Sequence, residues 1–414
     1  MVNKNSTNRI KIVNDPIYGF ISLEFPFLFE IIEHPYFQRL RRIQQLGLSH
    51  LVYPGAVHNR FAHAIGATHL MGKAIRSLRL KDVKISDDEY EAACIAILLH
   101  DVGHAPFSHT LEKTLLEGLD HEDVSLMIME LLNEEFNGKL SLAIEIFTNT
   151  YSRKFLNQLV SSQLDVDRLD YLKRDSFYSG VSEGIVSSER IIKMLSVVND
   201  DLVVDEKGIY SIEKFIVARR LMYWQVYLHK TVLSAEHLLI TVLERAKKLA
   251  SEKIDMFCSP SLQVFLYNRL DKETFTSDKK YLKRFLELDD IDIMGAIKVW
   301  QSHSDPILSY LCRALIERKL FKVQISKQVF DDNFISTIKN DIKEKFGEEW
   351  IKYLLIAGKI RNNAYDHTDK HIFVNMKNGE LLDFPQAADN LNISSLSEPV
   401  EKNFICYPKS FDVE

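Results

Sequence analysis

A histidine and an aspartate stand next to each other at the end of a long apolar run in this sequence. The run, residues 92–99, reads AACIAILL, and His100 and Asp101 follow it directly. It contains no Gly or Pro and no strict alternation, which predicts a buried helix. Burying an imidazole and a carboxylate costs several kcal/mol unless they are paired or bind a metal. We therefore expect the chemistry of the protein at this helix end.

Two more histidines follow within a few residues, His104 and His109, while Gly103 and Pro106 end the predicted helix. A single histidine at a helix end usually caps the helix or lies satisfied in the core. An adjacent His-Asp pair with two further histidines is less common. The local sequence leaves a structural role and a metal or catalytic site both open.

Two distant stretches carry residue types that bind metals. His63 lies in the segment NRFAH, residues 59–63, and the segment DVDRLDY, residues 165–171, holds three aspartates. Residues in a helix are about 100° apart, so we expect at most one or two of these aspartates to point inward. Two histidines and two carboxylates form a mixed nitrogen and oxygen set that suits Mn, Fe, Co, Ni or Zn. Such a site leaves positions open for water or a phosphate oxygen.

Other titratable and charged side chains flank these stretches. The candidates for acid–base chemistry near neutral pH are His104, His109 and His121. The side chains that could neutralise phosphates are Arg60, Arg168 and Lys173. Alternatively, Arg168, Lys173 and Arg174 form a solvated helix face.

Composition narrows the class of protein. The chain has 414 residues, enough for two or three packed units, and its net charge of −6 gives no general attraction to nucleic acid or an anionic membrane. Nucleic-acid binding would need a local basic patch and is not indicated. The first nine residues are polar, and no apolar stretch reaches about 18 residues, so we expect a cytoplasmic protein without a membrane segment. The four cysteines form no CxxC pair, which suggests neither a thiolate zinc site nor a disulfide framework.

The elements that must position these residues are mostly helical. Turn signals predict β-hairpins at residues 10–23, 201–211 and 371–384, the last around Lys377-Asn378-Gly379. Helical spacing predicts helices over 27–46 (closed by Gly47), from about 60 to 79, from about 87 to 101, and onward to about 169. Helices resume from 212 to about 253 and continue to about 319, and a strand is expected over 321–329. We divide the chain into a hairpin segment 1–24, a helical domain 25–320 and a small α+β C-terminal lobe 321–414.

Several long motifs in this order resemble the HD-domain metal-dependent phosphohydrolases, and within them the deoxynucleotide triphosphohydrolase branch. The matching motifs are NDPIYG (14–19), FQRLR (37–41), PGAVHNRFAH (54–63), HDVGHAPFSH (100–109) and DVDRLDY (165–171). The resemblance covers roughly residues 10–320. It implies a mostly α fold with an HD-domain helical core and an enzyme that hydrolyses dNTPs to a deoxynucleoside and inorganic triphosphate.

The resemblance also implies roles for particular residues. The metal ligands would be His63, His100, Asp101 and Asp167, with Asp165 and Asp170 as caps or as partners that orient the ligands. The catalytic group would be His104, His121 and Glu112, with His121 as the acid to the leaving group. Glu112 stands where the animal relative has an aspartate. The phosphate contacts would be Arg60, His109, Arg168 and Arg219, with a Mg²⁺ ion on the nucleotide phosphates.

On the same grounds, Gln45, Tyr171 and Asp175 would read the deoxyribose 3′-hydroxyl, and Tyr227 would lie against the sugar. Two alternatives stay open. The domain could act on other nucleotides, such as monophosphates, cyclic nucleotides or signalling nucleotides. It could also be a non-catalytic nucleotide sensor, although His104 and His121 would be unnecessary in a purely structural site.

A second nucleotide site is a further implication of the resemblance. The residues at the corresponding positions are Lys11, Asn14, Glu33, Gln38 and Arg41. In the relatives these positions bind a guanine nucleotide between subunits, which implies a GTP or dNTP effector and a homodimer or tetramer. The alternative is that these residues only cap and decorate the first helix.

Overall fold

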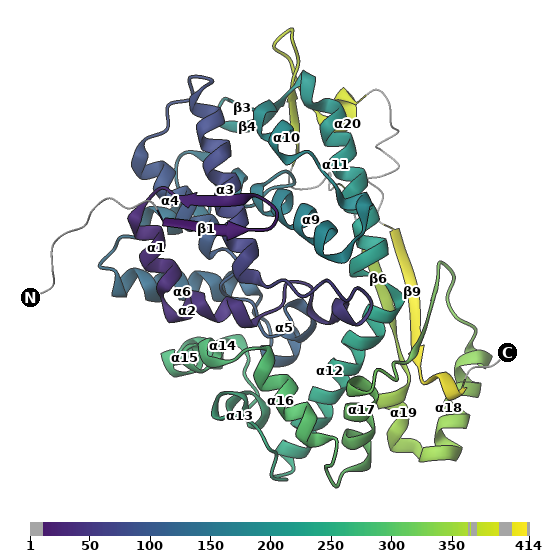
Figure 1. Ribbon diagram of the computed structural model, residues 1–414. Coiled ribbons are helices and arrows are strands. Elements are labelled where there is room, and N and C mark those ends of the chain that lie inside the picture. Colours follow the sequence, from purple (N-terminus) through teal and green to yellow (C-terminus); the bar gives the residue numbers. More distant parts are fainter. Residues whose placement is uncertain (1–10, 363–364, 366–370, 389–399, 412–414) are drawn as a thin grey trace, which may run out of the picture.

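The computed structural model describes residues 11–362, 365, 371–388 and 400–411. The chain folds mostly into α-helices, with short strands at its edges, which confirms the predicted fold class (Figure 1). Residues 1–10, on which part of the N-terminal prediction falls, lie outside the described residues.

Three packed helices form the centre of the molecule: α3 (Arg60–Arg79), α4 (Asp87–Leu99) and α9 (Val166–Ser179). Each begins at a residue whose side chain accepts a backbone N–H of the first turn, namely Asn59, Ser86 and Asp165. The predicted helices over 60–79 and 87–101 are thereby confirmed to within about two residues.

Gly66 lets α3 and α9 approach closely. A Cβ atom at this position would lie 2.1 Å from Asp170 Oδ1 and 2.2 Å from Arg174 Nη2. No residue larger than glycine fits there without displacing the side chains of Asp170 and Arg174. The approach brings the carboxylate of Asp170 to the imidazole of His63, one turn earlier on α3.

The N-terminal segment begins with the expected hairpin, in which β1 (Lys11–Asp15) pairs with β2 (Gly19–Leu23). The single helix expected over 27–46 is wrong. The structure has α1 (Pro26–Glu33), α2 (Pro35–Gln38) and a 3₁₀ turn (Arg39–Arg42), because Pro35 holds His34 in an extended conformation with ψ 137°. Gly47 does not close a helix but opens a second 3₁₀ turn, Gly47–Leu51.

Shorter helices surround the three central ones. They are α5 (His109–Leu115), α6 (His121–Glu135), α7 (Ser141–Phe147), α8 (Lys154–Val160), α10 (Ser188–Met194) and α11 (Ile209–Met222). A single π-helical turn, Tyr223–Tyr227, follows α11 and leads to the long α12 (Lys230–Ser251). Beyond it are α13 (Pro260–Tyr267), α14 (Lys272–Ser277), α15 (Lys279–Glu287), α16 (Asp290–Trp300) and α17 (Pro306–Ile316).

Two small sheets lie outside the helical core. One has the order β3-β4-β7-β8, from Leu195–Val198, Asp201–Asp205, Phe373–Asn375 and Leu381–Asp383. The other has the order β5-β9-β6, from Lys322–Ser326, Val400–Tyr407 and Ile356–Asn362. The remaining helices are α18 (Asp332–Phe346), α19 (Ile351–Leu354) and α20 (Phe384–Ala387).

The hairpin expected within 201–211 is wrong. Strand β4 pairs with the preceding β3, and Ile209 begins α11 instead of a second strand. The hairpin expected within 371–384 is confirmed, since β7 and β8 pair in antiparallel fashion. Strand β7 also pairs in parallel with β4, so residues after 320 contribute to both sheets. The division of the chain at residues 24 and 320 stays a prediction.

Among the described residues, no helix is long and apolar enough to cross a lipid bilayer. All four cysteines are free thiols, as expected, and Cys94, Cys312 and Cys406 are buried.

Candidate metal and nucleotide site

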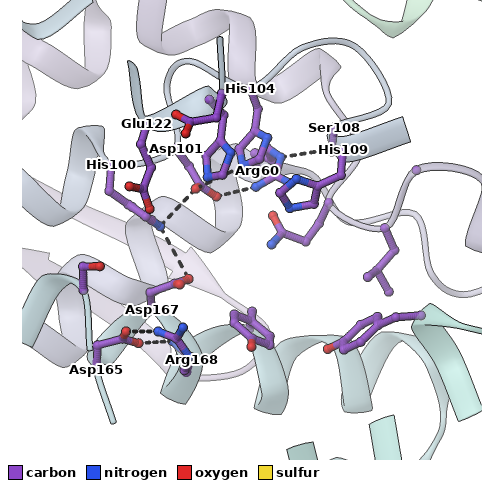
Figure 2. Close-up of a pocket in the computed structure, with 18 of the residues that line it drawn as sticks. Arg60, His100, Asp101, His104, Ser108, His109, Glu122, Asp165, Asp167 and Arg168 are labelled. Carbon is purple, nitrogen blue, oxygen red and sulfur yellow. Dashed lines mark hydrogen bonds and ion pairs between the residues drawn. The ribbon is translucent and has the colours of Figure 1, made fainter. Parts of the chain in front are cut away.

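The central helices bring the four residues of the expected ligand set together. His63 comes from α3, His100 and Asp101 from the end of α4, and Asp167 from the first turn of α9. Asp167 Oδ1 lies 3.1 Å from His63 Nε2 and 3.4 Å from His100 Nε2. Asp101 Oδ2 lies 3.6 Å from His63 Nε2, and Asp101 Oδ1 lies 3.2 Å from His100 Nε2. Figure 2 shows Asp101 and Asp167 on either side of the His100 ring.

The other nitrogen of each imidazole is held by an acceptor. His63 Nδ1 donates to Asp170 Oδ2 at 2.8 Å, and His100 Nδ1 donates to the carbonyl oxygen of Ile97 at 2.6 Å. These bonds fix the Nδ1–H tautomer and direct the Nε2 lone pairs toward the two carboxylates. Both Nε2 atoms are buried and make no well-directed hydrogen bond. Two imidazole lone pairs and two carboxylates at one point are a donor set that fits a divalent metal ion.

The electrostatics of this cluster agree with a cation site. Burial lowers the pKa of His63, but the carboxylates of Asp167 and Asp170 outweigh it and raise the pKa to about 10. Burial also opposes ionisation of Asp167, yet its contacts with His100 and His63 leave its pKa well below the ordinary range. The negative charges of Asp101 and Asp167 thus favour a cation between His63 Nε2 and His100 Nε2. A divalent cation at this point provides that charge while both imidazoles stay neutral.

All three aspartates of the segment 165–171 turn toward the interior, so the expectation that at most two do so is wrong. Asp165 is the N-cap of α9 and therefore precedes the helix, where the 100° spacing does not apply. Asp170 lies three residues after Asp167 and shares its side of the helix. The expected cap role of Asp165 is confirmed, and Asp170 is hydrogen-bonded to His63, whose role as a metal ligand stays a prediction.

A second cluster of titratable groups lies beside the first, on the turn after α4 and at the starts of α5 and α6. The rings of His104 and His121 are stacked, with centroids 4.0 Å apart and planes at 11°. Glu112 connects the cluster, because its Oε1 accepts from the backbone N–H of His121 at 2.7 Å and lies 3.3 Å from His121 Nδ1. Its Oε2 lies 3.0 Å from His109 Nδ1. One potential ligand atom from each of His104, His109, Glu112 and His121 lies within 4.8 Å of the others, so this cluster could hold a cation as well as serve acid–base chemistry.

The two stacked histidines have opposite pKa shifts. Burial and the positive charge of Arg60 hold the pKa of His104 well below its ordinary value. Burial also disfavours the cation at His121, but the hydrogen bond that its ring donates to Glu112 and the charges of Asp101 and Glu112 raise its pKa. Two adjacent imidazoles whose pKa values are shifted in opposite directions are suited to accept and to donate a proton, respectively.

Both clusters border a cavity of about 880 Å³, large enough for a nucleotide. The expected site residues that line it are Gln45, Arg60, His100, Asp101, His104, His109, His121, Asp167, Arg168, Tyr171, Asp175 and Tyr227. Of the remaining expected residues, His63 and Glu112 lie behind this lining. Arg219 is not among the lining residues either, although its charge acts on the pKa of Tyr171.

Two arginines at the cavity are tied to the metal-ligand region. Arg60 is buried, forms an ion pair with Asp101 and donates from Nε to Ser108 Oγ at 2.8 Å. Arg168 forms an ion pair with Asp165, and Figure 2 shows both contacts. The alternative of a solvated helix face is wrong for Arg174, which is buried and paired with Asp170 and Asp15.

Sequence reasoning missed several cavity residues. Ser108 and Glu122 adjoin His109 and His121 in the sequence, so their proximity was a usable signal. Tyr223 and Glu236 also line the cavity, but no motif marks them. Burial raises the pKa of Glu236 to about 7, against a hydrogen bond from Thr110 that lowers it.

None of the five residues expected at a second nucleotide site lines this cavity. Lys11 and Asn14 lie on β1, Glu33 ends α1, and Gln38 and Arg41 follow on α2 and the 3₁₀ turn. Arg41 Nε donates to Gln38 Oε1 at 2.7 Å, and the ammonium of Lys11 lies 4.1 Å from the centroid of the Phe29 ring. The five residues lie on the N-terminal hairpin and the helical turns beside it, and a second nucleotide site there stays a prediction.

The comparisons with known proteins agree with this geometry. A family model described as "HD domain" matches residues 60–175, and one described as "HD associated region" matches residues 186–259. A crystal structure of a phosphohydrolase from Bacteroides thetaiotaomicron is 50% identical, with a TM-score of 0.93 over 96% of this chain and 100% of that chain.

Two curated relatives extend the comparison. The protein YwfO of Bacillus subtilis is 35% identical over 319 residues, 75% of this chain and 71% of the relative. The deoxynucleoside triphosphate triphosphohydrolase SAMHD1 homolog of Dictyostelium discoideum is 32% identical over 262 residues, 58% of this chain and 50% of the relative.

The chain belongs to the HD-domain family and carries its phosphohydrolase domain. The resemblance identified in the sequence is thereby confirmed, including the relationship to proteins named as deoxynucleoside triphosphate triphosphohydrolases.

Proposed function

We propose that the protein hydrolyses deoxynucleoside triphosphates to a deoxynucleoside and inorganic triphosphate. The observation that carries this proposal is the position of the ligand set at the wall of a nucleotide-sized cavity, directly beside the histidine pair with opposite pKa shifts. The names of the animal and amoebal relatives support the choice of substrate.

His63, His100, Asp101 and Asp167 would hold one divalent transition-metal ion, such as Mn, Fe, Ni, Co or Zn. When bound, the ion supplies Lewis acidity toward a phosphoryl oxygen and toward the attacking water. Mg²⁺ would accompany the nucleotide phosphates, whose charge exceeds what the cationic side chains of the cavity offset.

The phosphates would be bound by Arg60, His109 and Arg168, with Arg219 as a further cation near Tyr171. Arg60 keeps a fixed orientation through Ser108 and Asp101, so its guanidinium is preorganised for an oxyanion. Hydrolysis at the α-phosphorus would release the triphosphate as one unit, since all three phosphates are held on the same side of the broken bond.

His121 would donate a proton to the leaving 5′-oxygen. Against the effect of burial, the hydrogen bond to Glu112 and the nearby carboxylates raise its pKa, which favours the protonated form that an acid needs, and the Glu112 carboxylate holds its Nδ1. His104 stays neutral and stacked against His121, where it can accept or orient a proton.

The sugar would lie at the part of the cavity formed by Gln45, Tyr171, Asp175 and Tyr227. Asp175 offers a carboxylate as acceptor for the 3′-hydroxyl, and the Tyr227 ring would leave no room beside the 2′-carbon for a hydroxyl group.

Binding of GTP or a dNTP at Lys11, Asn14, Glu33, Gln38 and Arg41, in a homodimer or tetramer, is part of the proposal. Lys11, Asn14, Glu33 and Arg41 are exposed and Gln38 is half-buried, so most of this set is accessible to an effector or a second subunit. Light scattering of the purified protein with and without GTP tests this part, and an unchanged mass together with unchanged activity would contradict it.

The direct test is incubation of the pure protein with Mn²⁺ and a panel of dNTPs, nucleoside monophosphates and cyclic nucleotides. We expect intact triphosphate and deoxynucleoside from dNTPs, separated by ion-exchange chromatography. Release of phosphate or pyrophosphate, or turnover of monophosphates or cyclic nucleotides alone, would assign the domain to another nucleotide. Tight nucleotide binding without any turnover would indicate a sensor.

A further inference from the structure

A buried chain of three side chains runs outward from the sugar end of the cavity. The Tyr227 hydroxyl donates to Asp175 Oδ2 at 2.8 Å, and Asp175 Oδ1 lies 2.7 Å from His58 Nε2. Asp175 is 1% exposed and His58 is 4% exposed. Tyr227 and Asp175 line the cavity, whereas His58 lies behind them and is not among the lining residues.

The directions of these hydrogen bonds follow from the chemistry of the groups. A carboxylate only accepts, so the His58 imidazole must donate from Nε2–H. Within the described part of the chain, His58 Nδ1 is buried and has no hydrogen-bond partner, and the polar contact of this ring is the one to Asp175. The ring is therefore arranged to serve one carboxylate.

The surroundings hold His58 in place. Its ring stacks on Tyr178, near the end of α9, with centroids 4.5 Å apart and planes at 15°. Gly55 allows the chain before His58 to pack closely against the end of α9, since a Cβ atom at this position would lie 2.6 Å from the carbonyl oxygen of Tyr178. The carbonyl oxygen of His58 also accepts from the backbone N–H of Gln45 at 3.0 Å, which places another cavity residue.

We propose that His58 is a positioning residue that fixes the Asp175 carboxylate, and through it the Tyr227 ring, for recognition of the sugar 3′-hydroxyl. The inference rests on the proposed function and deepens it, because it names a residue on which the choice of sugar depends. Without the Nε2–H donor, the carboxylate has a free oxygen inside the protein and can rotate about its Cβ–Cγ bond. The acceptor for the 3′-hydroxyl would then lose its fixed direction.

Two substitutions separate the hydrogen bond from the packing. His58→Gln keeps an N–H donor at the position of Nε2 but loses the ring, whereas His58→Phe keeps a ring against Tyr178 but loses the donor. His58→Met replaces the second variant if that one does not fold. His69→Phe is the matched control, because His69 contacts Tyr18 away from the cavity.

The measurement is kcat/KM of the Mn²⁺-loaded full chain for the four dNTPs and for their 2′,3′-dideoxy forms. We expect His58→Phe to lower kcat/KM for the dNTPs about tenfold, the value of a buried hydrogen bond to a charged group, and to leave the dideoxy substrates nearly unchanged. His58→Gln should keep most of the wild-type preference. Two results would overturn the proposal. One is an equal loss of kcat/KM for dNTPs and dideoxy substrates in His58→Phe. The other is a preference for dNTPs that is kept in His58→Phe but lost in His58→Gln.

Binding of the α,β-imido forms of the same nucleotides, measured by calorimetry, separates this inference from the proposed function. The inference is supported if the wild type binds nucleotides with a 3′-hydroxyl more tightly than dideoxynucleotides and His58→Phe does not. This holds even if no triphosphate is released. Triphosphate release without any preference for the 3′-hydroxyl in the wild type supports the function and overturns the inference. Absence of nucleotide binding overturns both.

Discussion

At the scale of single residues, the protonation of His121 depends on the carboxylate of Glu112. Two contacts connect them, from the backbone N–H of His121 at 2.7 Å and from its Nδ1 at 3.3 Å. Because a general acid must carry its proton, kcat should fall as the pH rises through the pKa of His121. Loss of the Glu112 charge lowers this pKa.

We therefore expect Glu112→Gln to move the alkaline limb of the kcat–pH profile to lower pH, and His121→Ala to lower kcat by about 10²–10⁴-fold. Glu117→Gln, an exposed glutamate paired with Arg269, is the control and should leave the profile unchanged. An alkaline limb that stays in place in Glu112→Gln would remove His121 from the role of acid.

A second residue-scale prediction concerns Asp170, which holds His63 in its ligand tautomer. Asp170→Asn should weaken binding of Mn²⁺ about 10–100-fold, as is usual for the partner of a metal-bound histidine. Isothermal titration calorimetry measures the affinity. Asp289→Asn, a buried aspartate paired with Arg42, is the control and should lower stability without changing the metal affinity. Equal metal affinity in both variants would contradict the role of Asp170.

The sequence was informative where chemistry is local and silent where it depends on contacts across the fold. The residues alone marked His63, the His100-Asp101 pair and an aspartate of 165–171, and the family resemblance singled out Asp167; the structure brings these four side chains together. Nothing in the sequence marked His58, because a buried histidine behind a cavity wall has no periodicity or motif of its own.

At the scale of elements, the turn after α4 must lie close to the start of α6 for His104 and His121 to stack. Gly103 permits this approach, since a Cβ atom there would lie 2.3 Å from the backbone nitrogen of Ser125 and 2.4 Å from the carbonyl oxygen of His121. The turn is also held by the bond from Gly103 N to Ser125 Oγ at 2.9 Å.

We expect Gly103→Ala to push α6 away from the turn, at a cost of about 1–3 kcal/mol in stability and with a large loss of kcat. Gly295→Ala, in α16 with open space around the position, should stabilise the protein by about 0.5–1 kcal/mol. Urea unfolding and steady-state kinetics check both. Wild-type activity of Gly103→Ala would contradict the need for this close approach.

Element prediction failed where a neighbour overrode the local pattern. The apolar spacing of 27–46 continues through Pro35. The ring of Pro35 disfavours the helical conformation at the preceding residue, and His34 is extended. Strand β3 pairs with one edge of β4 and β7, from the C-terminal segment, pairs with the other, so β4 has no edge left for residues 209–210, which begin α11. The π-helical turn that presents Tyr223 and Tyr227 has no recognised sequence signal.

At the scale of the whole molecule, Arg245 of α12 joins the helical core to the C-terminal segment. It is buried, donates to Asp305 Oδ1 at 3.0 Å and to Glu349 Oε1 at 2.6 Å, and lies 3.3 Å from the Tyr353 hydroxyl. The removal of one partner from a buried ion pair leaves the others uncompensated.

Arg245→Met should therefore lower the urea midpoint by an amount that corresponds to about 3–5 kcal/mol. Arg269→Met is the matched control, because its ion pair with Glu117 is exposed and screened by solvent, so its loss should leave the urea midpoint nearly unchanged. Similar midpoints for the two variants would show that this contact does not hold the C-terminal segment in place.

The central claim is that side chains from three separate helices hold one divalent ion beside the nucleotide cavity. Anomalous diffraction from crystals grown with Mn²⁺ locates that ion directly. We predict a single protein-bound peak between His63 Nε2, His100 Nε2, Asp101 and Asp167. A peak at His104, His109, Glu112 and His121 instead, or no peak at all in a folded protein, would contradict the account.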